Sequence, residues 1–134
     1  MLLVHIFIIL LIITLFLFIA EGMAHKLLFK PKKINKNELI SLKNKYNNHI
    51  EIGFINNQLN NNIIQYALVN FNKTPSFEDE NIIFFCHGNA GWLGDIIKYD
   101  SILQRFFKDY TIFIFDYSGY GMTTGVIKEN NIYL

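Results

Sequence analysis

Two glycine-rich turns carry the residues best suited to chemistry, and each turn follows a short apolar run. Residues 82–86 lead into the loop HGNAG (residues 87–91), and residues 111–115 lead into DYSGYG (residues 116–121). Apolar runs of this length are typical of strands buried on both faces in α/β proteins. A glycine-rich turn at the carboxyl end of such a strand lies where these folds bind ligands.

Two side chains in the first segment are candidate catalysts on residue type alone. Histidine is the usual general base, and Cys86 beside His87 suggests a Cys/His dyad. Adjacent residues on a strand point to opposite faces, so we do not expect these two side chains to hydrogen-bond. We predict instead that Cys86 is a small buried apolar residue. No metal site is predicted, because no partner at metal-ligand spacing accompanies His5, His25 or His49.

HGNAG followed about twenty-five residues later by a D-Y-x-G-Y-G turn resembles the α/β-hydrolase superfamily of serine hydrolases. The branch it looks most like is that of the membrane-anchored, bud-emergence-like proteins, which place a hydrophobic anchor before this signature. The likeness covers roughly residues 26–134. It implies the N-terminal half of an α/β-hydrolase fold, a mostly parallel sheet with an antiparallel first hairpin, preceded by one transmembrane helix.

The resemblance gives the first turn a role. In the superfamily, the loop after the third strand donates one backbone N–H of the oxyanion hole, and the residue after the nucleophile donates the other. Asn89 matches the first donor, and the loop would be shaped by His87, Gly88, Ala90 and Gly91. Because the family's catalytic histidine lies near the end of the domain, we expect His87 to be structural. Both glycines permit positive φ and a close approach of the backbone to a substrate. The alternative is an ordinary tight turn between a strand and a helix.

The second turn is architectural in the superfamily. We expect this end of the sheet to be shaped by Asp116, Gly119, Tyr120 and Gly121. The variable position, usually arginine in the family, is Ser118 here, so a charged anchor is missing. Ser118 is not expected to be a nucleophile, because its sequence context lacks the leading glycine of G-x-S-x-G.

The sequence contains no G-x-S-x-G motif. The family places its nucleophile, acid and histidine on later elements, so the resemblance implies a truncated α/β-hydrolase without a catalytic triad. Such a chain should be inactive alone, while the parent activity would be serine hydrolysis of carboxylic esters, thioesters or lipids. An acyl ester or lipid is the expected substrate, and no cofactor is expected. In the family's strand order, residues 82–86 lie beside residues 111–115 and would form an open apolar sheet edge, which is an aggregation hazard.

Two other classes of function stay open. One is a non-catalytic, membrane-anchored interaction protein. The other is a nucleotide-binding module, because Gly119, Gly121 and Gly125 give G-x-G-x-x-x-G after a strand. The acidic residue that accompanies a dinucleotide fingerprint would fall beyond the end of this sequence.

Residues 2–20 are almost unbroken apolar sequence, interrupted by His5 and Thr14. As a helix they would span about 28 Å, close to the roughly 30 Å of a bilayer core, so residues 1–21 are predicted to be a transmembrane anchor. A cleaved signal peptide is the rival interpretation, but a basic first region is absent and the apolar stretch is too long. We expect a single-pass protein of an endomembrane or the plasma membrane, with the lipid bilayer as its partner.

The orientation in the membrane stays open. The positive-inside rule favours a cytosolic carboxyl side, because the apolar stretch is followed by Lys26, Lys30, Lys32, Lys33 and Lys36. Members of the bud-emergence-like branch are often described with the opposite orientation. Asn72 begins a glycosylation sequon, whose occupancy would reveal a lumenal face.

The remaining elements follow from pattern and length. Residues 22–48 form a juxtamembrane lead-in with one helical turn within residues 38–48, and residues 49–134 form the partial domain. The strands 49–55 and 63–71 flank an asparagine-rich link that favours a hairpin. Residues 92–108 have the spacing of one amphipathic helix, and a further helix begins at Lys128. A formal net charge of +1 gives no reason to expect nucleic acid as a partner, and a single cysteine excludes an internal disulfide.

Overall fold

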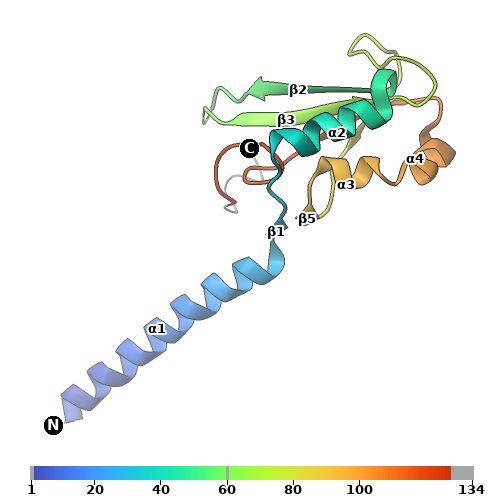
Figure 1. Cartoon of the computed structure of the whole chain (residues 1–134). Coiled ribbons are helices and arrows are strands. Elements are labelled where there is room, and N and C mark those ends of the chain that lie inside the picture. Colours follow the sequence, from blue (N-terminus) through green and yellow to red (C-terminus); the bar gives the residue numbers. More distant parts are fainter. Residues whose placement is uncertain (1, 60, 128–134) are drawn as a thin grey trace. The chain divides into compact units, whose positions relative to one another are not determined.

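The computed structural model describes residues 2–59 and 61–127, and the chain divides into two compact units, Met1–Lys30 and Pro31–Leu134 (Figure 1). The first unit consists mainly of the helix α1 (Leu2–Leu28), which extends past the predicted limit at residue 21. Its segment Val4–Ala24 has a mean hydropathy of 2.8 and is long and apolar enough to cross a membrane. A signal sequence near an N-terminus passes the same test.

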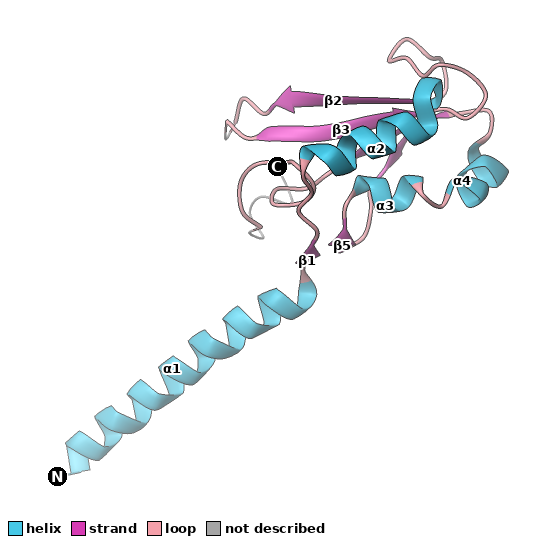
Figure 2. Cartoon of the chain, viewed as in Figure 1, coloured by secondary structure: helices cyan, strands magenta, loops and turns pink. Residues whose placement is uncertain are grey.

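The second unit is built on a four-stranded sheet in the order β2-β3-β6-β4. Figure 2 shows β2 and β3 side by side in this sheet. Its strands are β2 (Ile50–Asn56), β3 (Ile63–Val69), β4 (Ile82–Phe85) and β6 (Thr111–Phe115). The predicted β2–β3 hairpin is confirmed, with Ile50 opposite Val69 and Asn56 opposite Ile63. β3 also runs antiparallel to β6, and β4 is parallel to β6. A mostly parallel sheet is therefore not what the described residues form, because β3 runs opposite to both of its neighbours.

β4 lies beside β6, as predicted, and β6 is its sole neighbour within the described part of the chain. The prediction that both apolar runs are buried on both faces is correct for β6, where Thr111 to Ile114 are buried. It is wrong for β4, in which Ile82 and Phe84 are exposed, because an edge strand has fewer neighbours to cover it. Cys86, at the end of this strand, is also exposed rather than buried.

The prediction of a single helical turn within residues 38–48 is wrong, because a three-turn helix, α2 (Lys36–Tyr46), forms there. A capping box starts it: Glu38 N–H donates to Asn35 Oδ1 at 3.0 Å, and Asn35 N–H donates to Glu38 Oε2 at 3.1 Å. Leu39, Leu42 and Tyr46 then form its buried face. A short 3₁₀ helix, η1 (Asn47–His49), follows.

The predicted single helix over residues 92–108 is instead two helices, α3 (Leu93–Ile97) and α4 (Asp100–Phe107). A continuous helix with Leu93 and Ile97 facing the sheet would also turn Ser101 and Gln104 toward it. The break at Lys98 and Tyr99 rotates α4, so that Leu103 is buried instead. Burial of apolar side chains in the core therefore outweighs the continuity of a single helix.

The three helices α2, α3 and α4 supply buried side chains to one face of the sheet. These pack on residues from all four strands: Ile52, Ala67, Val69, Phe85, Ile112 and Ile114. The other face carries a separate cluster of Tyr66, Leu68 and Phe113, with Phe115 against it. A two-stranded sheet, β1 (Lys30–Pro31) with β5 (Ala90–Gly91), completes the fold. The helix predicted from Lys128 lies outside the described residues.

Candidate functional site

Because β4 and β6 are parallel neighbours, the loop after β4 and the turn after β6 emerge at the same edge of the sheet. In the loop, Gly91 adopts φ +82°, as predicted, and its carbonyl accepts a hydrogen bond from Lys32 N–H at 2.9 Å. Gly88 is not among the glycines of positive φ, and a Cβ added there would meet nothing within 4 Å. Gly91 is therefore the residue whose left-handed conformation shapes the loop.

The turn after β6 is packed tightly. Gly119 and Gly121 have φ values of +86° and +50°. Tyr120 is 1% exposed. Gly121 N–H donates to Lys32 O at 2.9 Å. Ser118 is half-buried, and its hydroxyl oxygen accepts a hydrogen bond from the Asn62 amide at 3.5 Å. The residues predicted to form a structural turn thus lie together in one compact segment.

Three contacts tie the turn to the loop. The Tyr117 hydroxyl donates to His87 O at 2.8 Å, and the Tyr120 hydroxyl donates to Asn89 O at 2.8 Å. Asp116 Oδ1 accepts from Leu93 N–H at 2.7 Å. The side chains of consecutive positions in the β6 turn therefore fix the beginning, the middle and the end of the β4 loop.

The loop at residues 87–91 and the turn at residues 116–121 together form a junction. His87 lies inside this junction, with its side chain fully buried. Its ring packs against the rings of Tyr117 and Tyr120, at centroid distances of 4.6 and 5.4 Å. Nδ1 lies 2.7 Å from Gly88 O. Nε2 lies 3.3 Å from Asp116 Oδ1, within ion-pair range, but the geometry does not satisfy an aligned hydrogen bond. The Nε2–Oδ1 approach is therefore a close polar contact between two buried side chains.

The Asp116 carboxyl is fully buried and faces opposing influences. Burial raises its pKa above the ordinary value, while His87 and the Leu93 N–H lower that pKa. Oδ2 has no hydrogen-bond partner among the described residues, and neither does the buried amide nitrogen of Gln65. A Cβ added at Gly121 would lie 2.0 Å from Asp116 Oδ2 and 2.8 Å from Gln65 Oε1. Glycine at 121 therefore makes room for two polar side chains.

The roles of two residues at this junction, Tyr117 and Gln65, were not predicted from the sequence. Tyr117 lies inside the recognised D-Y-x-G-Y-G pattern, but nothing in the spacing indicated that its hydroxyl reaches His87 O. Burial and the neighbouring Cys86 thiol raise the pKa of Tyr117. Gln65 is a polar residue inside an otherwise apolar strand and is fully buried. A buried polar residue in a strand needs hydrogen-bond partners, and that signal was available.

Asn89 and Ala90 lie on the exposed part of the loop, beside the buried His87. The bonds from the Tyr117 and Tyr120 hydroxyls hold two carbonyls of this loop at the edge of the sheet. The side chains at the junction include no paired nucleophile and base. Among the described residues, no group of three or more His, Cys, Asp or Glu side chains is placed to hold a metal ion.

The backbone of the β6 turn argues against a phosphate-binding loop. The N–H groups of Tyr120, Gly121 and Thr123 donate to backbone carbonyls, and that of Met122 donates to Gln65 Oε1 at 2.7 Å. A dinucleotide-binding turn directs such donors at a pyrophosphate. Here four consecutive donors are already used within the fold.

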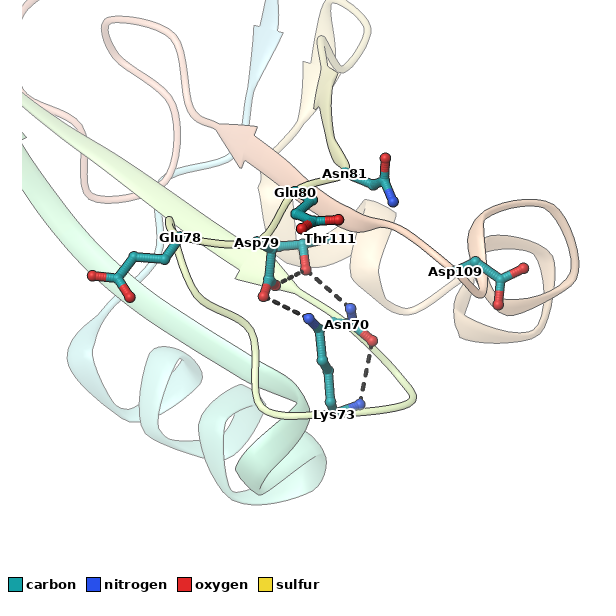
Figure 3. A pocket seen from close by; sticks show the side chains of 8 residues that line it. All are labelled: Asn70, Lys73, Glu78, Asp79, Glu80, Asn81, Asp109 and Thr111. Atoms are coloured by element: carbon teal, nitrogen blue, oxygen red, sulfur yellow. Dashed lines mark hydrogen bonds and ion pairs between the residues drawn. The ribbon is translucent and has the colours of Figure 1, made fainter.

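A pocket of about 330 Å³ lies at the opposite end of β6 (Figure 3). Asp79 is its centre: Oδ1 lies 2.6 Å from Lys73 Nζ, and Oδ2 accepts hydrogen bonds from the Thr111 hydroxyl and from Ser76 N–H. The Lys73 and Thr111 contacts lower the pKa of Asp79 to about 2. Asn70 completes the network by donating to Thr111 Oγ1 at 3.0 Å. These polar groups satisfy one another, which is typical of a structural junction.

No protein-family model, curated protein or solved structure matched this chain.

Proposed function

We propose that the second unit is the amino-terminal half of an α/β-hydrolase-type domain that α1 anchors in a membrane as a single-pass protein. The loop around Asn89 would receive the carbonyl oxygen of a carboxylic ester, a thioester or a lipid. The observation that most supports this proposal is the strand order β2-β3-β6-β4 with one parallel pair. That order brings HGNAG and DYSGYG together at one edge of the sheet.

The chemistry would be stabilisation of an oxyanion. A backbone N–H directed at the developing charge contributes on the order of 3 kcal/mol in acyl transfer. The second donor of such a site belongs to the residue after the nucleophile, and this sequence contains no G-x-S-x-G. We therefore propose that these 134 residues bind an acyl oxygen without turning over an ester.

Binding of a small carboxylate tests the site directly. Butyrate, titrated into the full chain in lipid nanodiscs, should shift the backbone amide resonances of residues 88–91 and leave those of the Asp79 pocket unchanged. Asn89→Pro, which removes the N–H, should abolish the shifts. The matched control Asn89→Ala keeps the N–H and should retain them. Equal shifts in the proline variant would contradict the proposal.

Two further observations would test the hydrolase assignment. A fluorophosphonate probe should leave the 134-residue chain unlabelled, because the probe requires an activated serine. Sequencing of the transcript past the codon for Leu134 should reveal a G-x-S-x-G within about forty codons. Labelling of the isolated chain, or a transcript without that motif, would count against the assignment.

A second candidate function, an anchored interaction protein, is favoured by the aromatic face of the sheet. The rings of Tyr66, Phe113 and Phe84 stack in sequence, with centroid distances of 5.6 and 4.8 Å. Phe84 is 65% exposed, and the described helices of the second unit pack on the other face. Large exposed apolar surfaces often mark protein interfaces. Phe84→Glu should then disrupt a complex that is seen on native gels of membrane extracts, whereas Asn89→Pro should leave the complex intact.

A further inference from the structure

Charge is distributed unevenly along the chain after the apolar span Val4–Ala24. The next stretch, residues 25–37, contains five lysines and no aspartate or glutamate. We call this stretch the basic segment. Residues 38–134 contain seven basic and ten acidic residues, which is a net charge of −3. The positive charge of the protein is therefore concentrated in the segment that directly follows the span.

Backbone hydrogen bonds hold the middle of the basic segment on the second unit. Lys32 N–H donates to Gly91 O at 2.9 Å, and Gly121 N–H donates to Lys32 O at 2.9 Å. Ile34 N–H donates to Gly121 O at 3.3 Å. Residues 32–34 are therefore bonded to both glycine-rich turns. Because this backbone is already ordered, it loses less conformational entropy on binding a ligand than a flexible linker would.

Two lysines of the basic segment are used inside the second unit. Lys33 Nζ donates to Thr123 O at 2.8 Å. Lys32 Nζ lies 3.5 Å from Glu38 Oε1 and 3.9 Å from Asp95 Oδ1. The ammonium groups of Lys32 and Lys33 therefore help to hold the segment against the fold.

Lys30 and Lys36 differ from these two lysines. Both are exposed, and neither has a recorded ion pair or side-chain hydrogen bond within the described part of the chain. Lys36 is also the first residue of α2. The positive end of the helix dipole disfavours a cation at that position. The charge of Lys36 therefore does not stabilise α2, and it remains available for a ligand.

We propose that the basic segment binds the headgroups of anionic phospholipids in the bilayer that α1 spans, through Lys30 and Lys36. Phosphatidylserine, for example, offers phosphate and carboxylate oxygens to these ammonium groups. Lysines that closely follow a membrane span are attracted to a negatively charged membrane surface, whereas the net negative charge of residues 38–134 is repelled by it. This inference rests on the membrane anchor of the proposed function, but it does not require binding of an acyl oxygen.

Spin-labelled lipids test the proposal on the full chain. The protein is reconstituted in phosphatidylcholine vesicles with a trace of spin-labelled phosphatidylserine or phosphatidylcholine, and electron paramagnetic resonance measures the fraction of label that the protein immobilises. At low salt the wild type should prefer phosphatidylserine about threefold to tenfold. High salt should remove most of the preference, because exposed charges are screened. Equal immobilisation of the two lipids at low salt would overturn the proposal.

A pair of double variants locates the preference on the chain. Lys30→Gln with Lys36→Gln should lower the preference for phosphatidylserine at least about twofold. The matched control is Lys43→Gln with Lys108→Gln, which removes the same charge from two exposed lysines outside the basic segment. This control should keep the preference of the wild type. An equal loss in both double variants would show that the total charge of the protein, and not the basic segment, selects the lipid.

The same spectra separate this inference from the proposed function. If the protein immobilises neither lipid, α1 does not lie in the bilayer, and the proposed anchor fails together with this inference. If it immobilises both lipids equally, the anchor stands and the inference is wrong. If phosphatidylserine is preferred while butyrate does not bind at residues 88–91, the inference stands and the proposed acyl-oxygen site fails.

Discussion

Two aspartates lie at opposite ends of β6 and differ in how their charge is stabilised. Asp79 accepts a hydrogen bond from Thr111, the first residue of the strand, whereas Asp116 directly follows Phe115, the last residue. Asp79 borders a pocket, is paired with Lys73, and has a pKa lowered to about 2. Asp116 is fully buried, and burial raises its pKa.

The difference shows what each carboxylate does for the protein. Hydrogen bonds and a cation satisfy both oxygens of Asp79, so its charge stabilises the folded state. Asp116 is desolvated, and one of its oxygens has no hydrogen-bond partner in the described part of the chain. Burying a polar group costs free energy unless it is fully hydrogen-bonded. Such a carboxyl at the junction of two loops is better explained by the geometry that its bond to Leu93 N–H imposes on them.

The largest expected effect comes from Asp116→Ala. The change leaves the His87 ring and the Leu93 N–H buried without their partner. Leaving two buried polar groups unpaired, at about 1 to 3 kcal/mol each, should cost about 2 to 6 kcal/mol. Urea unfolding of the full chain, followed by the fluorescence of Trp92, the single tryptophan, measures the loss. A loss near zero would mean that Asp116 does not anchor the junction.

Gly121→Ala should be the next most destabilising change. Position 121 has φ +50°, and the added Cβ would lie 2.0 Å from Asp116 Oδ2. Strain and overpacking together should cost about 2 to 4 kcal/mol in the same unfolding experiment. Gly88→Ala is the matched control, because its Cβ would meet nothing within 4 Å. Its free energy of unfolding should stay within about 0.5 kcal/mol of the wild type. Equal effects at the two glycines would contradict the packing described here.

Tyr117→Phe and Tyr120→Phe should each cost about 1 kcal/mol, the contribution of one hydrogen bond. The lost bonds are those to the carbonyls of His87 and Asn89. Amide hydrogen exchange should quicken within residues 87–91 and stay unchanged in β3. Uniform quickening throughout the sheet would show that these hydroxyls stabilise the fold rather than the loop.

The pH dependence of stability should distinguish the two aspartates. The pKa of Asp79 is depressed from 3.8 to about 2, so its contribution is present above pH 3.8 and is lost as pH falls through about 2. The pKa of Asp116 is raised, so its contribution is present below pH 3.8 and is lost as pH rises through the folded-state pKa. The melting temperature of Asp79→Asn should therefore approach that of the wild type as pH is lowered. The melting temperature of Asp116→Asn should instead fall further below that of the wild type as pH is lowered.

The smallest expected effect concerns glycosylation and not the stability of the fold. Asn72 lies on the exposed loop beside the Asp79 network and begins the glycosylation sequon. If the lysines after the apolar stretch keep the second unit cytosolic, Asn72 will carry no glycan. Endoglycosidase treatment of the chain from secretory-pathway membranes should then leave its gel mobility unchanged. A mobility shift would place the second unit in the lumen and reverse the orientation.

Local signals in the sequence located the hairpin, β4, β6 and both glycine-rich turns, because these depend on apolar runs and turn residues. The break between α3 and α4 was not predictable, because it depends on which side chains meet the sheet. The exposure of Cys86 depends in the same way on β4 lying at an edge. The capping box of Asn35 and Glu38 can be recognised from the sequence pattern, but it is not among the predictions made above.

The candidate site was only partly predictable for a related reason. The motif located His87, Asn89 and Asp116, but not the contacts that join them. Those contacts depend on the parallel pairing of β4 with β6, which brings together segments about thirty residues apart. The Leu93 N–H bond to Asp116 arises from the same pairing.

Hydrogen exchange at Leu93 tests most directly whether the turn after β6 holds the loop after β4. The N–H groups in the first turn of a helix have no partner within the helix, and this one donates to Asp116 Oδ1. We expect the Leu93 amide in the full chain to exchange as slowly as the amides of β6, and Asp116→Ala to remove that protection. Exchange in the wild type as fast as at the exposed Gln58 would contradict the account.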